Sequence, residues 1–312
     1  MAPETREILA GIDIGASKTR MAIYQNGKLV PFFHQPTPQD PEIFISMVSA
    51  ALHRSVSDLS GIGIGCPGPL DQERGLVLSP PNLPQWDRFP VADRLEREFG
   101  VPVFLENDGN AGALGEALFG SARDCRRVFY MTISTGLGTG IVIDRRVYRG
   151  AHGLAGEIWA FDPGHFPNSG RNVILNELAS GTGMVLQARH YLEQGEESSV
   201  TAGVRDSRTV LEAAEQGDAL AVRIVKETRE TLGTTLLFVL YLLDPDVIVL
   251  GGGLCTQPHR IVDPVLELVR QRLRIPTQAC YTAHRPQLLR VDFPTQGAPH
   301  GFGHHHSRRH QH

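Results

Sequence analysis

The apolar and polar positions at the start of the chain predict three consecutive strands. The apolar run 8–14 closes on Gly15, and the apolar segments 21–24 and 28–33 flank Asn26-Gly27. Asn-Gly between two such runs is the strongest short-range hairpin signal, because both residues tolerate a positive φ. We therefore expect three antiparallel strands. Apolar residues at helical spacing then predict a helix over 41–56.

Strands and helices alternate through the rest of the chain. Strands are predicted over 61–66, 103–105, 127–133, 141–143 and 247–250, and helices over 91–99, 173–191, 207–216, 219–243 and 261–273. Asp244-Pro245 ends the long helix, because proline disfavours the helical region for the residue before it. A strand, a glycine turn and a second strand occur around Gly15 and again around Gly136, which indicates an internal duplication. The pattern predicts an α/β fold with helix-covered sheets.

Composition excludes several classes of protein. Of 312 residues, 41% are hydrophobic and 21% charged, which is typical of a soluble globular protein. A net charge of −4 predicts neither a nucleic-acid surface nor a basic membrane patch. The apolar segment 232–243 is too short to span a bilayer, and the N-terminus lacks the apolar core of a secretory signal. The four cysteines have no C-x-x-C spacing, so we expect a reducing cytoplasm rather than a disulfide framework or a cysteine zinc site.

The length allows two domains, and three regions are expected along the chain. Residues 1–118 would form an N-terminal α/β domain, and residues 119–296 a larger C-terminal α/β domain. Residues 297–312 are rich in histidine and lack hydrophobic periodicity, so we expect a disordered tail.

Glycine turns follow three of the predicted strands. They are DIGASKT (13–19), STGLGTG (134–140) and GGG (251–253). Glycine allows a backbone to approach an anion, and successive N–H groups form a concavity that favours phosphate oxygens. The candidate nucleotide-binding residues are Asp13, Gly15, Ser17, Lys18, Thr135, Gly136, Gly138, Gly252 and Gly253.

Each of these residues also has a simpler interpretation. A lone glycine turn is most often only a hairpin, and Lys18 is as well explained by a surface pair with an acid. None of the turns matches a P-loop, and none opens a helix in a Rossmann unit. Asp13, at a strand end beside a turn, suits Mg²⁺ held through water, since Mg²⁺ takes few carboxylates and keeps its waters.

The segment PVFLENDGNAGALGE (102–116) carries an acid and an amide at the end of a strand. Glu106-Asn107-Asp108 follows the apolar run, and small residues come next. Asn and Asp are favoured N-cap residues, so capping of a helix explains them structurally. Standing between two candidate phosphate turns, the same carboxylate is also a candidate proton acceptor.

Taken together, these motifs resemble the ROK family of bacterial sugar kinases and related repressors. The matching segments are DIGASKT, GIGIGCPGPLD, PPNLPQW, ENDGNAGALGE, TISTGLGTGIVIDRRVYRGAHGLAGE and VIVLGGGL. The resemblance implies two actin-like, ribonuclease-H-like domains of the ASKHA superfamily around a cleft. ATP would lie on the first two turns, with Gly251 to Gly253 near its adenosine.

The resemblance also implies roles for particular residues. Asp108 would be the catalytic base, and Asn82, Asn107 and Glu157 would bind sugar hydroxyls. Relatives are commonly homodimers. Family repressors carry an N-terminal DNA-binding segment, for which a DIGASKT motif that begins at residue 13 leaves no room, so a kinase is favoured.

The sequence departs from the family pattern after Glu157. Trp159-Ala160 stands where relatives have Gly-His, and the cysteine cluster that binds structural zinc in relatives is missing. Asn176 occupies the position of the glutamate that contacts the sugar in relatives. We therefore expect no structural zinc, and packing of Trp159, Phe161 and Phe166 in its place.

Two interpretations of this segment stay open. His165 and Glu177 replace the missing sugar contacts, or the sugar pocket has changed. Structurally, His165 is explained as a loop histidine and Glu177 as an exposed helix residue.

The prediction is thus a cytoplasmic ATP:hexose kinase for glucose or an N-acetylhexosamine, using ATP and Mg²⁺. The alternative is a catalytically weak regulator that binds sugar or nucleotide.

Overall fold

The computed structural model describes residues 7–15, 17–80, 83–162, 173–201 and 203–274, and the backbone of 287–290. The strands are β1 (Ile8–Ile14), β2 (Lys18–Gln25), β3 (Lys28–Pro36), β4 (Gly61–Cys66), β5 (Leu70–Asp71), β6 (Leu76–Leu78), β7 (Asp87–Phe89), β8 (Val103–Asn107), β9 (Arg127–Ile133), β10 (Leu137–Ile143), β11 (Arg146–Val147), β12 (Val247–Gly251) and β13 (Gln287–Arg290). The α-helices are α1 (Pro41–Ser55), α2 (Val91–Phe99), α3 (Asp108–Leu118), α4 (Leu175–Ala179), α5 (Gly181–Glu193), α6 (Ser207–Glu215), α7 (Ala219–Leu243) and α8 (Val262–Arg272). Short 3-10 helices are η1 (Pro84–Trp86), η2 (Ile158–Ala160) and η3 (Gly253–Cys255).

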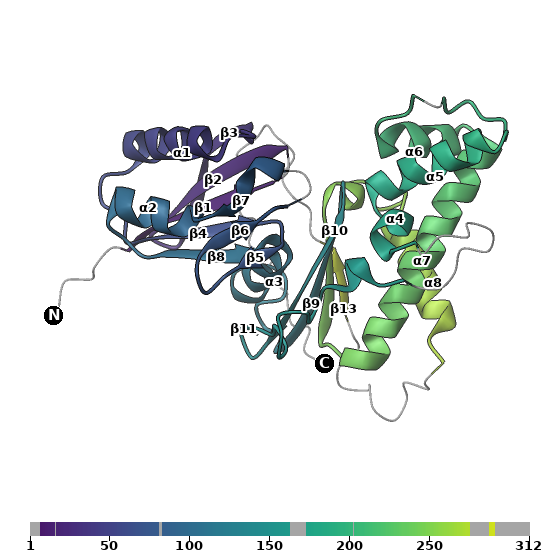
Figure 1. Cartoon of the computed structure of the whole chain (residues 1–312). Coiled ribbons are helices and arrows are strands. Elements are labelled where there is room, and N and C mark those ends of the chain that lie inside the picture. The colour runs from purple at the N-terminus through teal and green to yellow at the C-terminus, as the bar shows by residue number, and fades with distance from the viewer. Residues whose placement is uncertain are drawn as a thin grey trace, which may run out of the picture.

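Two five-stranded sheets repeat one topology, which confirms the duplication indicated by the sequence (Figure 1). The first sheet has the order β3-β2-β1-β4-β8, and the second has β11-β10-β9-β12-β13. In each, the first three strands of the chain pair antiparallel and the last two join in parallel. The predicted Asn26-Gly27 hairpin joins β2 to β3, with both residues at positive φ.

The first sheet buries one face only. Alternate residues of β1 and β4, such as Ile12 and Ile64, point into a core. Phe44 of α1 and Leu95 of α2 belong to the same core. The opposite face is exposed and mixed in character, with Asp13 as well as the large apolar side chains of Leu9 and Phe104. This period of two follows from the alternation of side chains along a strand.

The second sheet is buried on both faces. In β9, Phe129, Met131 and Ile133 pack into the helical layer of α4 to α8. Val128 and Tyr130 pack into a smaller cluster with Ala113 and Ala117 of α3. Strands that are covered on both faces have continuous apolar sequences, and this pattern predicted the strands β9 and β12.

Helix α3 lies between the two sheets (Figure 1). It follows β8 of the first sheet directly in the chain. On one side Ala111 approaches Gly65 of β4, where a Cβ on Gly65 would lie 3.6 Å from that of Ala111. The other side packs against β9 and β10 of the second sheet.

Several predicted elements differ from the structure. The helix expected over 173–191 is two helices, because Ser180 adopts an extended conformation and its side chain caps α5 through Gly183 N–H. The turn expected over 134–140 ends at Gly136, and Gly138 lies within β10. The three-stranded sheet β5-β6-β7 was not predicted.

Other expectations are not decided by the fold. The boundary at residue 118 stays a prediction, and residues 297–312 lie outside the described residues. Of the helices in the described part of the chain, none is both long enough and apolar enough to cross a membrane.

Candidate active site at the junction of the two sheets

Asp108 begins α3 at the point where β8 ends. Asn107 is the N-cap, as the capping interpretation predicts: its Oδ1 accepts hydrogen bonds from Gly109 N–H at 2.9 Å and Asn110 N–H at 3.3 Å. Gly109 N–H also donates to Asp108 Oδ1 at 2.8 Å. The strand end and the cap therefore fix the Asp108 carboxylate at a rigid place in the fold.

The Asp108 carboxyl has an altered pKa. Burial is the main cause and raises it, while the bond from Gly109 N–H acts in the opposite direction. The negative charges of Asp13 and Glu157 raise it further. Asp13 belongs to β1 of the first sheet and Glu157 follows β11 of the second, so the structure brings these three predicted acids into one electrostatic neighbourhood.

Close backbone packing holds α3 against β10. A Cβ on Gly109 would lie 2.4 Å from Thr139 O, and one on Gly140 would lie 2.5 Å from Gly109 O. Neither position has room for a side chain. A Cβ on Gly138 would lie 3.0 Å from Thr132 Cγ2 and 3.8 Å from Asp108 Oδ1, so β10 runs beside the carboxylate.

The first glycine turn lies at the end of β1. Gly15 N–H donates to Lys18 O at 3.0 Å, and Thr37 Oγ1 donates to Gly15 O at 2.7 Å. Ser17 and Lys18 are exposed. Asp13 pairs with Arg20 at 3.1 Å, and half of the Asp13 side chain is accessible.

The second and third glycine turns meet in space. Gly181 N–H donates to Ser134 O at 2.8 Å, and Thr182 N–H donates to Thr135 O at 3.0 Å, which joins the second turn to the start of α5. A Cβ on Gly253 would lie 3.6 Å from Ser134 Oγ. Gly252 has a φ of 94°, and a Cβ there would lie 2.5 Å from Ile133 O. Its glycine is therefore required by packing against β9.

Asn176 supports the second turn. Its Oδ1 accepts a hydrogen bond from Leu137 N–H at 2.8 Å and would lie 3.2 Å from a Cβ on Gly136. The amide that stands in place of the expected acid thus binds the backbone of the turn. Its neighbour Glu177 is half-buried rather than exposed, and accepts a hydrogen bond from Ile174 N–H at 3.3 Å at the start of α4.

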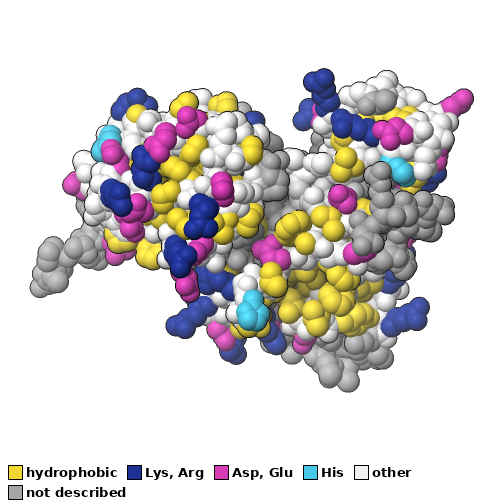
Figure 2. Space-filling view, viewed as in Figure 1, with side chains coloured by type: hydrophobic (Ala, Val, Ile, Leu, Met, Phe, Trp, Pro, Cys, Tyr) yellow, Lys and Arg dark blue, Asp and Glu magenta, His cyan; other side chains and the backbone are white. Residues whose placement is uncertain are grey.

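The segment after Glu157 is held partly by aromatic packing. Trp159 Nε1–H donates to Glu157 Oε2. Phe161 stacks on Phe238 of α7, with ring centroids 6.2 Å apart. Both residues belong to the half of the molecule on which Figure 2 shows a group of exposed apolar side chains. Phe161 thus makes one aromatic contact while 55% of it stays exposed, and the packing of all three aromatic residues in place of zinc stays a prediction. Asn82, His165 and Phe166 lie outside the described residues.

Glu106 forms a network that the sequence interpretation missed. Its Oε1 accepts hydrogen bonds from Asn107 N–H at 2.9 Å, from Asn110 Nδ2 at 3.1 Å and from Gln72 Nε2. Its Oε2 pairs with Arg149, which follows β11. A glutamate that ends an apolar strand was a signal, but nothing in the sequence placed Arg149 beside it.

The donor set suits magnesium better than a metal bound by protein alone. Within the described residues no three His, Cys, Asp or Glu side chains gather as a metal cluster. Asp13 is an accessible carboxylate beside the Gly15 turn, which fits an ion held mainly by water and phosphate. The expected lack of structural zinc stays a prediction, since part of that segment lies outside the described residues.

Comparison with known proteins identifies the family. The ROK family model matches residues 9–299. A glucokinase from Halalkalibacterium halodurans is 32% identical over 274 residues, covering 82% of this chain and 83% of that protein. The chain therefore belongs to the ROK family.

Related proteins include both enzymes and repressors. The crystal structure of a ROK family glucokinase from Streptomyces griseus, in complex with glucose and AMPPNP, aligns with a TM-score of 0.70 and 28% identity over 91% of this chain and 93% of that chain. A xylose repressor from Caldicellulosiruptor bescii is 26% identical over 85% of this chain and 70% of that protein. The structural match confirms the predicted actin-like fold with two α/β domains.

Proposed function

We propose that this protein is an ATP-dependent sugar kinase that transfers the γ-phosphoryl group of ATP to a hexose hydroxyl. The observation that carries the proposal is the Asp108 carboxylate, fixed between the two sheets and close to β10, with the acids Asp13 and Glu157 around it. Phosphoryl transfer requires alignment, charge neutralisation and an acceptor for the hydroxyl proton. Glucose is the proposed acceptor substrate, supported by the glucokinase relative, and an N-acetylhexosamine is the alternative.

Asp108 is proposed as the general base. As the hydroxyl oxygen bonds to the γ-phosphorus, its proton passes to Asp108 and the bond from the γ-phosphorus to the bridging oxygen breaks, which releases ADP. A carboxyl of raised pKa is a better proton acceptor, provided that it is ionised before the reaction. Its position at a strand end and a helix cap supplies the rigidity that this role needs.

The sugar is proposed to lie beside Asn107. The Asn107 Oδ1 atom is used by the helix cap, whereas its Nδ2 group takes no part in the cap and would donate to a sugar hydroxyl. Glu157 would accept from another hydroxyl, its orientation set by Trp159. Asn82, His165 and Glu177 are proposed as further sugar contacts.

The phosphates are proposed to lie on the first two turns. Gly15, Ser17, Lys18, Thr135 and Gly136 would contact phosphate oxygens, and Asp13 would hold Mg²⁺ through water. Gly138 would keep the space beside Asp108 open. Gly252 and Gly253 would approach the adenosine, because they adjoin the second turn.

A coupled assay of ADP release tests the function. A panel of hexoses, amino sugars and N-acetylhexosamines is offered with ATP and Mg²⁺, and with polyphosphate as a second donor. Turnover with at least one sugar is expected. Binding of sugar or ATP without turnover would instead favour the regulator, a role for which the repressor relative is the precedent.

The cellular setting is proposed on the same basis. We infer that the protein is cytoplasmic, since the proposed reaction needs the ATP of the cytoplasm. We also infer a homodimer, since members of the family that it resembles are commonly dimers. Light scattering of the purified protein would show a mass of two chains.

A further inference from the structure

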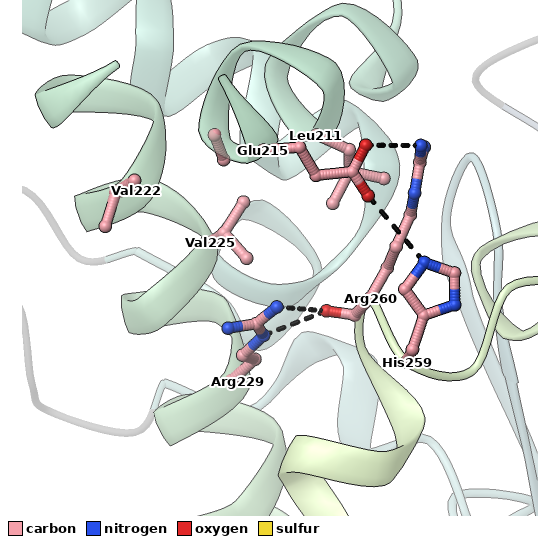
Figure 3. A pocket seen from close by; sticks show the side chains of 8 residues that line it. Leu211, Glu215, Val222, Val225, Arg229, His259 and Arg260 are labelled. Carbon is pink, nitrogen blue, oxygen red and sulfur yellow. Dashed lines mark hydrogen bonds and ion pairs between the residues drawn. The ribbon is translucent and has the colours of Figure 1, made fainter. Parts of the chain in front are cut away.

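A cavity of about 170 Å³ lies between α6, α7 and the segment that leads into α8 (Figure 3). We call it the α6–α7 pocket. Its lining residues are Leu211, Ala214, Glu215, Val222, Val225, Arg229, His259 and Arg260. None of the residues proposed for phosphoryl transfer lines it. The proposed function therefore gives it no role.

The pocket is lined by more basic side chains than acidic ones. Arg260 Nη2 donates to Glu215 Oε2 at 2.7 Å, and His259 Nε2 lies 3.7 Å from Glu215 Oε1. The single carboxylate of the pocket is thus already shared by two basic groups. Figure 3 shows this cluster on one side of the cavity and Arg229 on another.

Arg229 has a different set of partners. Its Nε and Nη2 groups both donate to the carbonyl oxygen of Arg260, at 2.9 and 2.6 Å. A carbonyl oxygen accepts hydrogen bonds but brings no full negative charge. Across the described ranges, no carboxylate forms an ion pair with Arg229, and its Nη1 group takes no part in the bonds to Arg260.

The surroundings of Arg229 do not favour its charge. Burial lowers the pKa of its guanidinium, and no neighbouring charge acts against that effect. Val225 of the same helix and Leu211 of α6 are buried beside the cavity. A positive charge at an apolar wall is stabilised when an anion with hydrogen-bond acceptors comes next to it.

We propose that the α6–α7 pocket binds a small organic carboxylate with a short apolar body. The carboxylate would accept hydrogen bonds from Arg229 Nη1, and the apolar body would lie against Leu211, Val222 and Val225. The volume sets the size of the ligand, since it is below the roughly 300–1,000 Å³ of pockets that hold drug-sized molecules. An acid of a few carbon atoms fits this space.

The test is a calorimetric titration of the full chain with butyrate and with isovalerate. Thermal unfolding in the presence of each acid is the second measurement. Butyramide is the uncharged control, and formate and inorganic phosphate are anions without an apolar body. We expect saturable binding of the two acids, weaker binding of formate and phosphate, and none of butyramide.

Variants decide whether the binding occurs in this pocket. R229M removes the charge, and A214L fills the cavity while leaving Arg229 in place. R229M should weaken butyrate binding about tenfold or more, the usual scale for losing a charge-assisted hydrogen bond. A214L should weaken it as well, because the larger side chain takes the space of the apolar body. K226M removes an exposed charge from the same helix outside the pocket and should change nothing.

Three results would overturn the proposal. One is the absence of saturable binding of either acid to the unaltered protein. A second is butyrate binding that A214L leaves unchanged. The third is phosphate binding that is as tight as that of butyrate and that A214L weakens, which separates it from phosphate held on the proposed nucleotide turns. Because the readout is binding at this pocket rather than turnover, these results do not depend on whether the chain is a sugar kinase.

Discussion

The carboxylate of Glu106 and the guanidinium of Arg149 form an ion pair that joins the end of β8 in the first sheet to the segment after β11 in the second. Glu106 is the more buried partner, with 15% of its side chain exposed against 46% for Arg149. The same carboxylate accepts a hydrogen bond from Asn107 N–H, next to the proposed catalytic base. The pair therefore links the two halves of the molecule beside the candidate site.

Removal of this pair should lower stability measurably. R149M leaves the Glu106 carboxylate half-buried without its cation, so we expect the free energy of unfolding to fall by about 1 kcal/mol. E106Q and the double variant complete a cycle measured by urea unfolding. A coupling energy near zero would show that the two side chains contribute independently.

Loss of the base should abolish most turnover. Asp108→Asn removes the proton acceptor but keeps an oxygen for Gly109 N–H, so the fold should be retained. We expect kcat to fall about 10²–10⁴-fold, the usual contribution of a general base, with ATP affinity little changed. Unchanged kcat in a folded variant would assign Asp108 to the helix terminus alone.

The same variant should change the dependence of stability on pH. The pKa of Asp108 is 3.8 in the unfolded chain and higher in the folded protein. The folded state therefore binds more protons between these two values, and the stability of the unaltered protein falls as pH rises through them. Asp108→Asn should be the more stable protein at neutral pH and lose that advantage below pH 3.8. Denaturant unfolding at several pH values tests this, and a constant difference would contradict it.

The cap and the sugar contact at Asn107 can be separated. Asn107→Ala removes the oxygen that caps α3 and should cost about 1 kcal/mol of stability. Asn107→Ser keeps a capping oxygen but loses the amide donor, so stability should be nearly retained while KM for the sugar rises. If KM for the sugar stays constant in the serine variant, Asn107 has only a structural role.

Substitution of Gly136 should weaken nucleotide binding. A Cβ there would lie 3.2 Å from Asn176 Oδ1, which holds Leu137 N–H, so Gly136→Val should disturb the second turn. We expect the Kd for ATP, measured by calorimetry, to rise about tenfold or more. Gly203→Val is the control, since Gly203 lies in the loop before α6, where among the described residues a Cβ would meet only Thr201 Oγ1, at 3.8 Å. Equal affinities in both variants would remove the second turn from the nucleotide site.

Local patterns predicted most of the elements that position the site. Asn26-Gly27 predicted the hairpin between β2 and β3. The continuous apolar run of β9 predicted a buried strand, and Asn107 predicted the start of a helix. Each of these depends on neighbours in the chain. The small sheet β5-β6-β7 was missed because its strands are two or three residues long and show no clear period.

The remaining features depend on contacts between distant residues. The glycines of 134–140 read as one turn, but Gly140 lies within β10 and is a glycine because α3 approaches that strand closely, whereas a Cβ on Gly138 would meet Thr132 of β9. Asn176 looked like a lost sugar contact and instead binds Leu137. Arg149 has no motif of its own, and only the arrangement of the two sheets brings it to Glu106.

The position of α3 has a consequence for dividing the molecule. The helix continues from a strand of one sheet, yet Ala113 and Ala117 are fully buried against the other. A fragment ending at residue 118 would expose that face of α3 to water, and a fragment starting at 119 would expose Val128 and Tyr130. The two halves therefore share one helix, and neither can be excised with its surface intact.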